Sequence, residues 1–464
     1  MKNITIDYTN IMNPTDNSRF LNDHDFESIR KDIETIQKQI QSERETNEAL
    51  HFLSLPNAYD KRYSKTVFGN VLIDAKSQID SRTKQIRNNF SDYVQIAIGG
   101  SALGSIALVD ALGEGPVNVH LPDNIDPEWI ASILDKIDPQ RTILNIISKS
   151  GGTVETLSTF FIFYEELKKK VDKNTLKERI TIMTNPERGP LYMLAKAEGF
   201  QLIPIPNSVH GRFSVLSPGG LLTAAVAGIN IDELLDGARK MDEITTHSDF
   251  WKNPVLIYAA IHYLLNTRKS IDTLVLMPYS NSIKAIADWY SQLVAESLGK
   301  KGMGVTPVKA VGATDQHSQL QLYNDGPKNK FITFFSVEKF RSHFQIPEAF
   351  PSTQDFQYLS GHSINELFHS EERATAYSVY KNMVPNCTIK IPEVSAYYMG
   401  QLFMFLEKVI PVLGNLYNVN AFDQPGVEES KEYARALLGK EGEAYEKKRR
   451  EIEAYSDPAN RKIV

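Results

Sequence analysis

Two short runs of glycine and hydroxyl residues carry the clearest chemical signal in this chain. Each run follows a strand-like apolar stretch and opens a predicted helix; the runs are Gly99-Gly100-Ser101-Ala102-Leu103-Gly104 and Ser148-Lys149-Ser150-Gly151-Gly152-Thr153-Val154-Glu155-Thr156. A helix start presents free backbone N–H groups, glycine lets a ligand approach closely, and hydroxyls add further donors. The two runs therefore predict one anion pocket, with a phosphate as its ligand, at the carboxyl edge of a parallel sheet.

Two nucleotide-binding fingerprints each fail at a single position. The dinucleotide motif Gly-x-Gly-x-x-Gly meets Ser101 where its second glycine belongs, and the P-loop motif meets Ser105 where its lysine belongs. Either run alone is also typical of ordinary turns and helix caps. The presence of both, together with the residues described next, favours a phosphate pocket without a nucleotide cofactor.

Glu296 is the candidate base. It lies near the end of a predicted amphipathic helix whose C-cap is Gly299, where the negative end of the helix dipole disfavours an ionised carboxylate. A carboxyl group in that setting takes up a proton more readily and can act as a general base. Gln292 lies one turn earlier on the same helix face. A solvated glutamate at a helix end is the more ordinary interpretation of these residues.

Three further residues could supply charge or exchange protons. Arg212, in Gly211-Arg212-Phe213-Ser214, could place a fixed positive charge at the edge of a sheet. His317 lies in a polar, loop-like stretch and could exchange protons near neutral pH. Lys431 is, by itself, one more surface lysine. None of the three is distinctive alone, because surface arginines and hydrogen-bonded structural histidines are common.

The elements that must position these residues follow a strand–helix alternation from about residue 93. Strands are predicted at 94–98, 117–121, 142–147, 180–183, 202–205, 273–277, 331–335 and 388–391, and helices at 154–168, 282–298 and 396–413. This alternation predicts an α/β fold with two parallel-sheet domains. The predicted division is a helical N-terminal extension (1–90), a first α/β domain with a helical connection (91–268), a second α/β domain (269–435) and a helical C-terminal tail (436–464).

Composition restricts the class of protein. A net charge of −6 argues against a nucleic-acid surface, and no apolar run approaches the length of a membrane span. The chain has one cysteine, Cys387, so no internal disulfide can form, and no signal peptide is visible; both observations suit a cytoplasmic location. The ten histidines are scattered without metal-ligand spacing, so neither a metal nor another cofactor is predicted.

The motifs together resemble a known family. The two hydroxyl runs look like the sugar isomerase (SIS) domains that bind phosphosugars. The matching blocks span about residues 96 to 431 and are similar to the glucose-6-phosphate isomerase (phosphoglucose isomerase) family in its shorter bacterial form; the blocks are Gly211-Arg212-Phe213-Ser214, Ala295-Glu296-Ser297-Leu298-Gly299-Lys300, the His317 stretch and Phe422-Asp423-Gln424-Pro425-Gly426-Val427-Glu428-Glu429-Ser430-Lys431. One departure is His210, which stands where the family usually has glycine or proline.

The resemblance implies the reversible isomerisation of glucose 6-phosphate to fructose 6-phosphate, a step of glycolysis and gluconeogenesis, through a cis-enediol and without metal or cofactor. It implies that Glu296 moves the proton, that Arg212 stabilises the enediolate, and that His317 and Lys431 serve ring opening. The substrate-binding residues that it implies are Ser148, Lys149, Ser150, Thr153 and Thr156 for the phosphate and Gly100, Ser101, Gln292 and Gln424 for the sugar.

The family also implies a homodimer whose site takes its histidine from the neighbouring subunit. Three alternatives stay open: another phosphosugar isomerase that also accepts mannose 6-phosphate, a non-catalytic phosphosugar sensor, and a structural or interaction protein. Glu296, His317 and Lys431 argue against a sensor, because binding alone does not need them. A structural protein leaves the hydroxyl runs unexplained.

Overall fold

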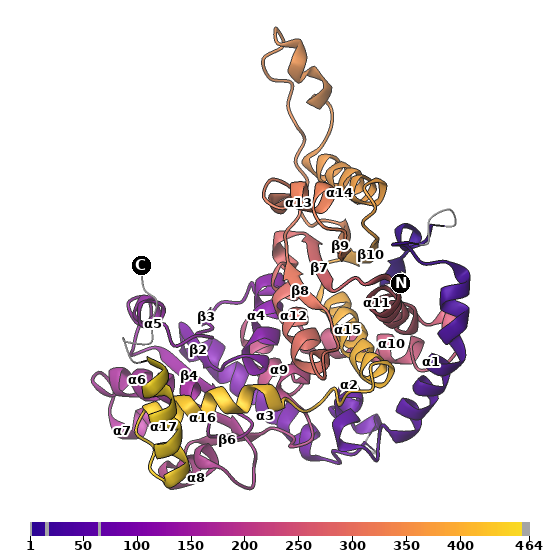
Figure 1. Cartoon of the computed structure of the whole chain (residues 1–464). Coiled ribbons are helices and arrows are strands. Elements are labelled where there is room, and N and C mark those ends of the chain that lie inside the picture. The colour runs from indigo at the N-terminus through magenta and orange to yellow at the C-terminus, as the bar shows by residue number, and fades with distance from the viewer. Residues whose placement is uncertain (1, 14–17, 64–65, 457–464) are drawn as a thin grey trace. The chain divides into compact units, whose positions relative to one another are not determined.

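The computed structural model describes residues 2–13, 18–63 and 66–456 of the chain. They form two compact units, Met1–Val419 and Asn420–Val464. The larger unit holds two five-stranded sheets (Figure 1). The smaller unit holds α16 (Glu428–Leu437) and α17 (Glu443–Ser456). The predicted tail is therefore helical except at residues 438–442, and its residues 457–464 lie outside the described part.

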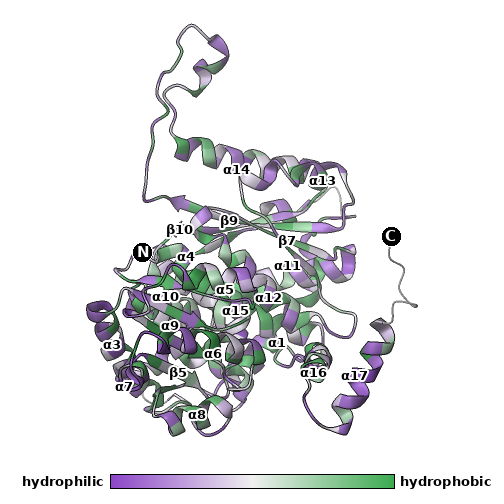
Figure 2. Ribbon diagram, turned by 90° about the vertical axis from the view of Figure 1, so that its left-hand side faces the viewer, coloured by the Kyte–Doolittle hydropathy of each residue, from purple (hydrophilic) through white to green (hydrophobic). Residues whose placement is uncertain are grey.

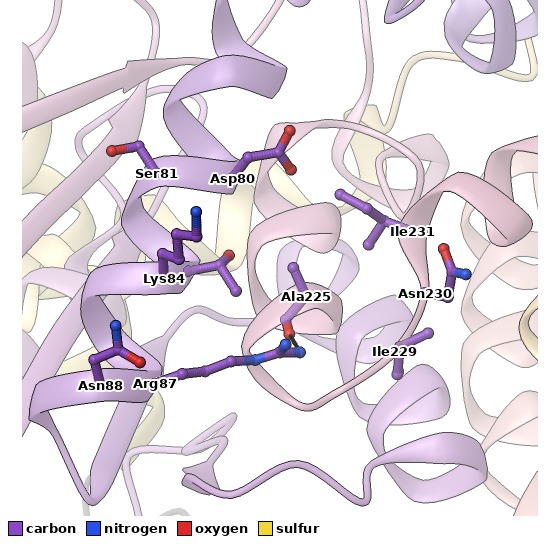
Figure 3. A pocket seen from close by; sticks show the side chains of 10 residues that line it. Asp80, Ser81, Lys84, Arg87, Asn88, Ala225, Ile229, Asn230 and Ile231 are labelled. Carbon is purple, nitrogen blue, oxygen red and sulfur yellow. Dashed lines mark hydrogen bonds between the residues drawn. The ribbon is translucent and has the colours of Figure 1, made fainter.

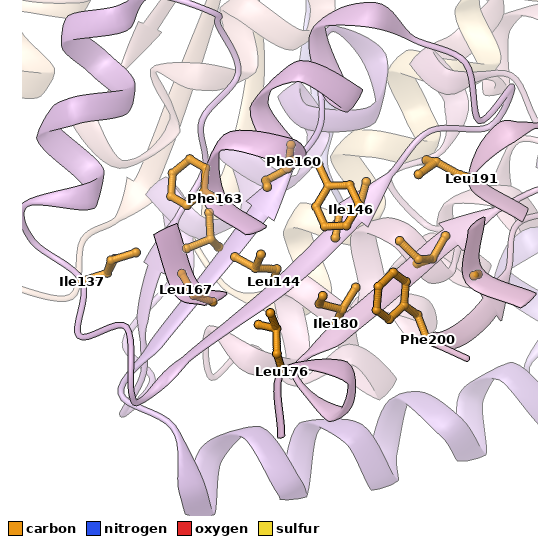
Figure 4. Packing of buried hydrophobic residues seen from close by; sticks show 14 of the residues in the cluster. Ile137, Leu144, Ile146, Phe160, Phe163, Leu167, Leu176, Ile180, Leu191 and Phe200 are labelled. Carbon is orange, nitrogen blue, oxygen red and sulfur yellow. The ribbon is translucent and has the colours of Figure 1, made fainter. Parts of the chain in front are cut away.

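The first sheet is wholly parallel, as predicted, with the strand order β3-β2-β4-β5-β6. Its central strands are buried along their length because helices cover the sheet, which explains why they are almost continuously apolar in the sequence. Phe160 and Phe163 of α6 pack in one core cluster with Leu144 and Ile146 of β4 (Figure 4). The elements are β2 (Asp92–Ile96), α4 (Gly100–Leu112), β3 (Asn118–His120), α5 (Pro127–Leu134), β4 (Thr142–Ile147), α6 (Val154–Lys168), α7 (Lys173–Glu178), β5 (Ile180–Thr184), α8 (Pro190–Glu198) and β6 (Gln201–Pro204).

The second sheet has the order β1-β10-β9-β7-β8. It confirms the prediction of a second α/β motif, but its two edge strands differ from that prediction. The edge strand β1 (Thr5–Asp7), from the predicted helical extension, pairs antiparallel with β10. The other edge strand, β8 (Thr306–Lys309), is short, includes Pro307 and is not fully buried at any position, so it lacks an apolar signature. The remaining elements are β7 (Thr273–Tyr279), α12 (Ala285–Leu298), α13 (Leu320–Asp325), β9 (Lys330–Lys339), α14 (Ile364–Lys381), β10 (Asn386–Glu393) and α15 (Ala396–Leu416).

Six further helices surround or connect the two sheets: α1 (Asp23–Glu43), α2 (Leu55–Ala58), α3 (Val71–Asn89), α9 (Pro218–Val226), α10 (Ile231–Ile244) and α11 (Pro254–Lys269). Helix α9 is buried throughout, and α15 nearly so; both are largely hydrophobic in Figure 2. Two glycines let α10 and α15 approach closely: a Cβ on Gly237 would overlap the carbonyl oxygen of Tyr397, and a Cβ on Gly400 would overlap that of Leu234. Within residues 2–13, 18–63 and 66–456, no helix combines the length and apolarity that crossing a membrane requires.

An arm of residues 340–363 leaves the second sheet after β9 and returns at α14 (Figure 1). The arm is closed at its base by backbone hydrogen bonds from Ile346 to His362 (2.8 Å) and from Ile364 to Phe344 (2.8 Å). Four of its aromatic side chains are exposed, namely those of Phe344, Phe350, Phe356 and Tyr358. Four exposed aromatic side chains on one projection form a surface of the kind that a protein partner covers.

A buried ion cluster ties α10 to α15 and to the end of α1. Asp242 lies 2.7 Å from the Nζ of Lys408 and 3.1 Å from a guanidinium nitrogen of Arg44. Burial alone would raise the pKa of Asp242, but Lys408 and Arg44 outweigh burial and hold it below its usual value. Asp242 is therefore ionised at neutral pH and neutralises a lysine that is itself buried.

Asp242→Ala is expected to lower the free energy of unfolding by about 3–5 kcal/mol at neutral pH, because the substitution leaves the Lys408 ammonium buried without its carboxylate. The measurement is urea denaturation, with Glu165→Ala as the control. Glu165 pairs with Lys168 on the exposed surface, so its loss should lower the free energy of unfolding by less than about 1 kcal/mol. Since the folded-state pKa of Asp242 is depressed, its contribution should begin to fall as the pH drops below about 4, the unfolded pKa, and should be lost below the folded pKa. Equal losses in the two variants would contradict this role.

Candidate active site

An ion pair between Arg212 and Glu296, which lie 84 residues apart in sequence, joins the first α/β part of the chain to the second. Arg212 belongs to the 3₁₀ turn η4 (Gly211–Phe213), which follows β6 at the carboxyl edge of the first sheet, and Glu296 lies in the last turn of α12. The NH1 of Arg212 donates to the Oε1 of Glu296 over 3.0 Å. The Arg212 side chain is 2% exposed and that of Glu296 21%. The pair thus places a fixed positive charge against a carboxylate that solvent can still reach.

Gln292 holds the second oxygen of the same carboxylate. Its Nε2 donates to the Oε2 of Glu296 over 2.9 Å, which confirms that the two residues share one helix face. The Oε1 of Gln292 is buried and has no hydrogen-bond partner in the described part of the chain. A Cβ on Gly99 would lie 3.2 Å from the Gln292 Nε2, so the glycine run of the first sheet borders this group. An acceptor is therefore available here for a donor on a ligand.

The start of α4 packs directly on the arginine turn. A Cβ on Gly100 would overlap the backbone nitrogen of Arg212, so only glycine allows this approach. The Oγ of Ser101 would lie 3.7 Å from a Cβ on Gly211. His210, the departure from the family pattern, has φ −73° and ψ 148°, a conformation that any residue adopts, so it does not alter the turn.

The second hydroxyl run forms the turn between β4 and α6. Ser148 Oγ and Thr153 Oγ1 share a hydrogen bond of 2.9 Å, and the backbone N–H of Gly152 donates to Ser150 Oγ over 3.3 Å. Thr153 is the N-cap of α6, but its side chain makes no capping hydrogen bond. The Oγ1 of Thr156, one turn into the helix, is buried and lacks a hydrogen-bond partner in the described part of the chain. Hydroxyls and helix N–H groups at one turn suit a phosphate.

Lys149 links this turn to the ion pair. Burial and the nearby positive charge of Arg212 lower the pKa of Lys149, while Glu48 acts in the opposite direction. Lys149 is therefore close enough to Arg212 to be affected by its charge, and the hydroxyl run and the Arg212–Glu296 pair together make up the candidate site. That site joins the carboxyl edge of the first sheet to the end of α12, as Figure 1 shows for α4 and α12.

His317 is not joined to this site by any contact within the described residues. It is exposed and follows the 3₁₀ turn η7 (Thr314–Gln316), beyond the carboxyl end of β8. The hydroxyl of Tyr279, the last residue of β7, donates to Gln316, which fixes this turn at the carboxyl edge of the second sheet. Helix α12 runs back from that edge, so Glu296 lies roughly 16 Å further along the helix than Ala285.

Lys431 and Gln424 lie in the smaller unit. Lys431 is on α16 and donates to the Oε1 of Glu428 over 2.9 Å. Gln424 precedes the 3₁₀ turn η9 (Pro425–Val427). The roles expected for these two residues stay predictions.

The end of α12 carries two features that were not predicted from the sequence. The Nζ of Lys300 donates to the backbone carbonyl of Ser297 over 2.9 Å, so Lys300 and Arg212 together oppose the negative end of the helix dipole. The Oγ of Ser297 accepts a 2.8 Å hydrogen bond from the Nε of Arg212. Ser297 directly follows Glu296 in the family-matching stretch Ala295–Lys300, and that adjacency is the one sequence signal that could have identified it.

A separate cavity of about 670 Å³ lies between α3 and the connection from α9 to α10 (Figure 3). Lys84 and Arg87 line it, but Arg87 donates to the carbonyl of Ala225 at the end of α9 and thereby caps that helix. None of the predicted site residues lines this cavity. Across residues 2–13, 18–63 and 66–456, no group of three or more His, Cys, Asp or Glu side chains could hold a metal ion.

Comparisons with known proteins agree on one family. A family model described as phosphoglucose isomerase matches residues 77–452. A glucose-6-phosphate isomerase from Carboxydothermus hydrogenoformans is 41% identical and covers 97% of each chain, and one from Methanocaldococcus jannaschii is 40% identical over 76% of this chain and 85% of the relative. The crystal structure of a glucose-6-phosphate isomerase from Chlamydia trachomatis superposes with a TM-score of 0.81 at 21% identity, over 95% of this chain and 91% of that one, and shares the fold.

Proposed function

This chain belongs to the phosphoglucose isomerase family, and from that membership we infer that it interconverts D-glucose 6-phosphate and D-fructose 6-phosphate. The observation in the site that carries the inference is the Arg212–Glu296 pair beside a turn rich in hydroxyls. An aldose–ketose exchange needs one base that moves a proton between neighbouring carbons and one cation for the oxygens that become negative. The pair supplies both groups, and the turn suits the phosphate.

In the proposed mechanism, Glu296 removes the proton from C2 of the open aldose and the electron pair moves into a C1–C2 double bond. The resulting cis-enediolate carries its negative charge on oxygens that face Arg212. A proton then moves from O2 to O1, and Glu296 returns its own proton to C1, which leaves the carbonyl at C2, a hydroxyl at C1 and the ketose complete. The hydrogen bond from Gln292 to Oε2 orients the carboxylate for both transfers.

Ring opening precedes this exchange and needs a proton at the ring oxygen and removal of one from O1. We assign these transfers to His317 and Lys431, by their match to the family's blocks. His317 lies at the opposite edge of its own sheet from Glu296, which supports a site completed by the histidine of a second copy. The exposed aromatic arm of residues 340–363 offers a surface for such a homodimer.

We further propose that the division of the chain at residues 90, 268 and 435 and its cytoplasmic location hold as predicted. The two separate sheets support the boundary at 268, although β1 (Thr5–Asp7) of the N-terminal segment joins the second sheet.

The activity is tested by supplying fructose 6-phosphate and following glucose 6-phosphate with a coupled dehydrogenase. Steady turnover by the purified, folded chain is expected. Mannose 6-phosphate serves as the comparison substrate, since a broader phosphosugar isomerase would consume both sugars. Absence of turnover on fructose 6-phosphate would overturn the assignment.

The double variant Ser150→Ala and Thr153→Ala is expected to raise KM by roughly 10- to 100-fold and to change kcat much less. The phosphate is held alike in the ground and transition states, so the loss of two hydroxyl donors weakens uniform binding. Thr153 makes no side-chain cap bond, so helix α6 should keep its stability. Steady-state kinetics measures the effect, with Ser132→Ala on α5 as the control; an unchanged KM would place the phosphate elsewhere.

A further inference from the structure

Two neighbouring residues of α12 hold two different edges of the same guanidinium group. Glu296 accepts from NH1 of Arg212 over 3.0 Å, and Ser297 accepts from Nε over 2.8 Å. Ser297 is fully buried, so its hydroxyl cannot exchange this partner for bulk water. Its backbone is fixed in turn, because the Nζ of Lys300 donates to its carbonyl oxygen. Ser297 thus anchors the guanidinium group at Nε, the nitrogen nearest the aliphatic part of the Arg212 side chain.

Resting on the proposed isomerase function, we propose that Ser297 is a positioning residue that holds the Arg212 guanidinium in the orientation the enediolate needs. With Nε held by Ser297, NH1 donates to Oε1 of Glu296, and the second oxygen of the carboxylate accepts from Gln292. Without that anchor, the guanidinium can turn to form two parallel hydrogen bonds to Glu296. Such a bidentate pair holds the carboxylate as an anion and withdraws the arginine from the substrate oxygens.

The first test compares three single variants. Ser297→Ala removes the acceptor, and Ser297→Cys keeps nearly the same volume with a much weaker acceptor. Both are expected to lower kcat by about 10- to 100-fold while KM stays within about threefold, because the effect is confined to the transition state. Ser291→Ala is the matched control: its hydroxyl lies on the same helix and has no hydrogen-bond partner in the described part of the chain, so wild-type kcat is expected.

The second test measures binding and so does not depend on turnover. The probes are a phosphorylated hydroxamate, a planar anion that mimics the enediolate, and sorbitol 6-phosphate, which carries no charge at that position. Ser297→Ala should weaken the binding of the hydroxamate by about tenfold and leave the affinity for sorbitol 6-phosphate unchanged. In an Arg212→Ala background the same substitution should change neither affinity, because its target is gone.

The outcomes separate the two claims. A wild-type chain that does not turn over fructose 6-phosphate would refute the isomerase function itself. An active wild type whose Ser297→Ala and Ser297→Cys variants keep full kcat would refute only the role of Ser297. A loss of hydroxamate affinity that persists undiminished with Arg212→Ala would show that Ser297 acts by another route and would equally overturn the proposal.

Discussion

Glu296→Gln is expected to fold and to bind sugar phosphate but to lose turnover by about 10²- to 10⁴-fold or more. The amide has nearly the shape of the carboxylate, and it can still accept from Arg212 through its oxygen. It cannot take a proton from C2, so the step that forms the enediolate loses its base. The loss should appear in kcat, with a modest change in KM.

Coupled kinetics gives the turnover, and thermal unfolding establishes that the variant is folded. Asp288→Asn is the matched control: it changes a carboxylate to an amide on the same helix, where Asp288 pairs with Lys309 outside the site. That control should keep wild-type turnover. A Glu296→Gln enzyme with near-normal kcat would remove Glu296 from the mechanism.

A mixture of two inactive proteins, Glu296→Gln and His317→Ala, should regain about a quarter of wild-type activity after subunit exchange. If each site takes Glu296 from one copy and His317 from the other, a hybrid dimer holds one site with both groups intact and one with neither. Random mixing makes about half of the dimers hybrids, and each hybrid has one working site of two. The positions of the two residues at opposite edges of one sheet motivate this expectation.

The exchange must be demonstrated independently, by tagging one variant and isolating dimers that carry both forms. The control mixes Glu296→Gln with Arg212→Ala; both residues come from one copy here, so no intact site can form and no activity should return. Isolated hybrids of the first pair without activity would show that both residues act within one chain, and the shared site would be refuted while the isomerase function could stand.

Strands with strong apolar runs were predictable, and the two edge strands of the second sheet were not. The boundaries of β4 (Thr142–Ile147) and α6 (Val154–Lys168) agree with the prediction residue by residue, because burial on both faces makes β4 continuously apolar. By contrast, β1 and β8 are short and only partly buried, and β1 pairs with a strand more than 380 residues away. A local sequence pattern cannot indicate a pairing strand so far away in the sequence.

The site divides in the same way. The residues near each turn could be found from local spacing, as with Gln292 and Glu296 one helical turn apart. The meeting of Arg212 with Glu296 and Ser297 could not, since it depends on how α12 packs against η4 and α4, which come from the other part of the chain. The sequence pattern indicated Glu296 because it lies at the negative end of a helix dipole. The structure adds two cations at the same helix end, Lys300 and Arg212. The roles of Gln424 and Lys431 stay predictions.

The glycine contact between α10 and α15 bears on how this enzyme can vary. Any side chain at Gly237 or Gly400 would push the two helices apart. Helix α15 also packs on α12, where Phe403 contacts Trp289 with ring centroids 4.7 Å apart, and α12 carries Glu296. A bulkier residue at either glycine would displace α15, and rigid packing would pass that displacement on to α12 and to Glu296. Both positions should therefore tolerate no larger residue in natural or laboratory evolution, although neither is among the predicted site residues.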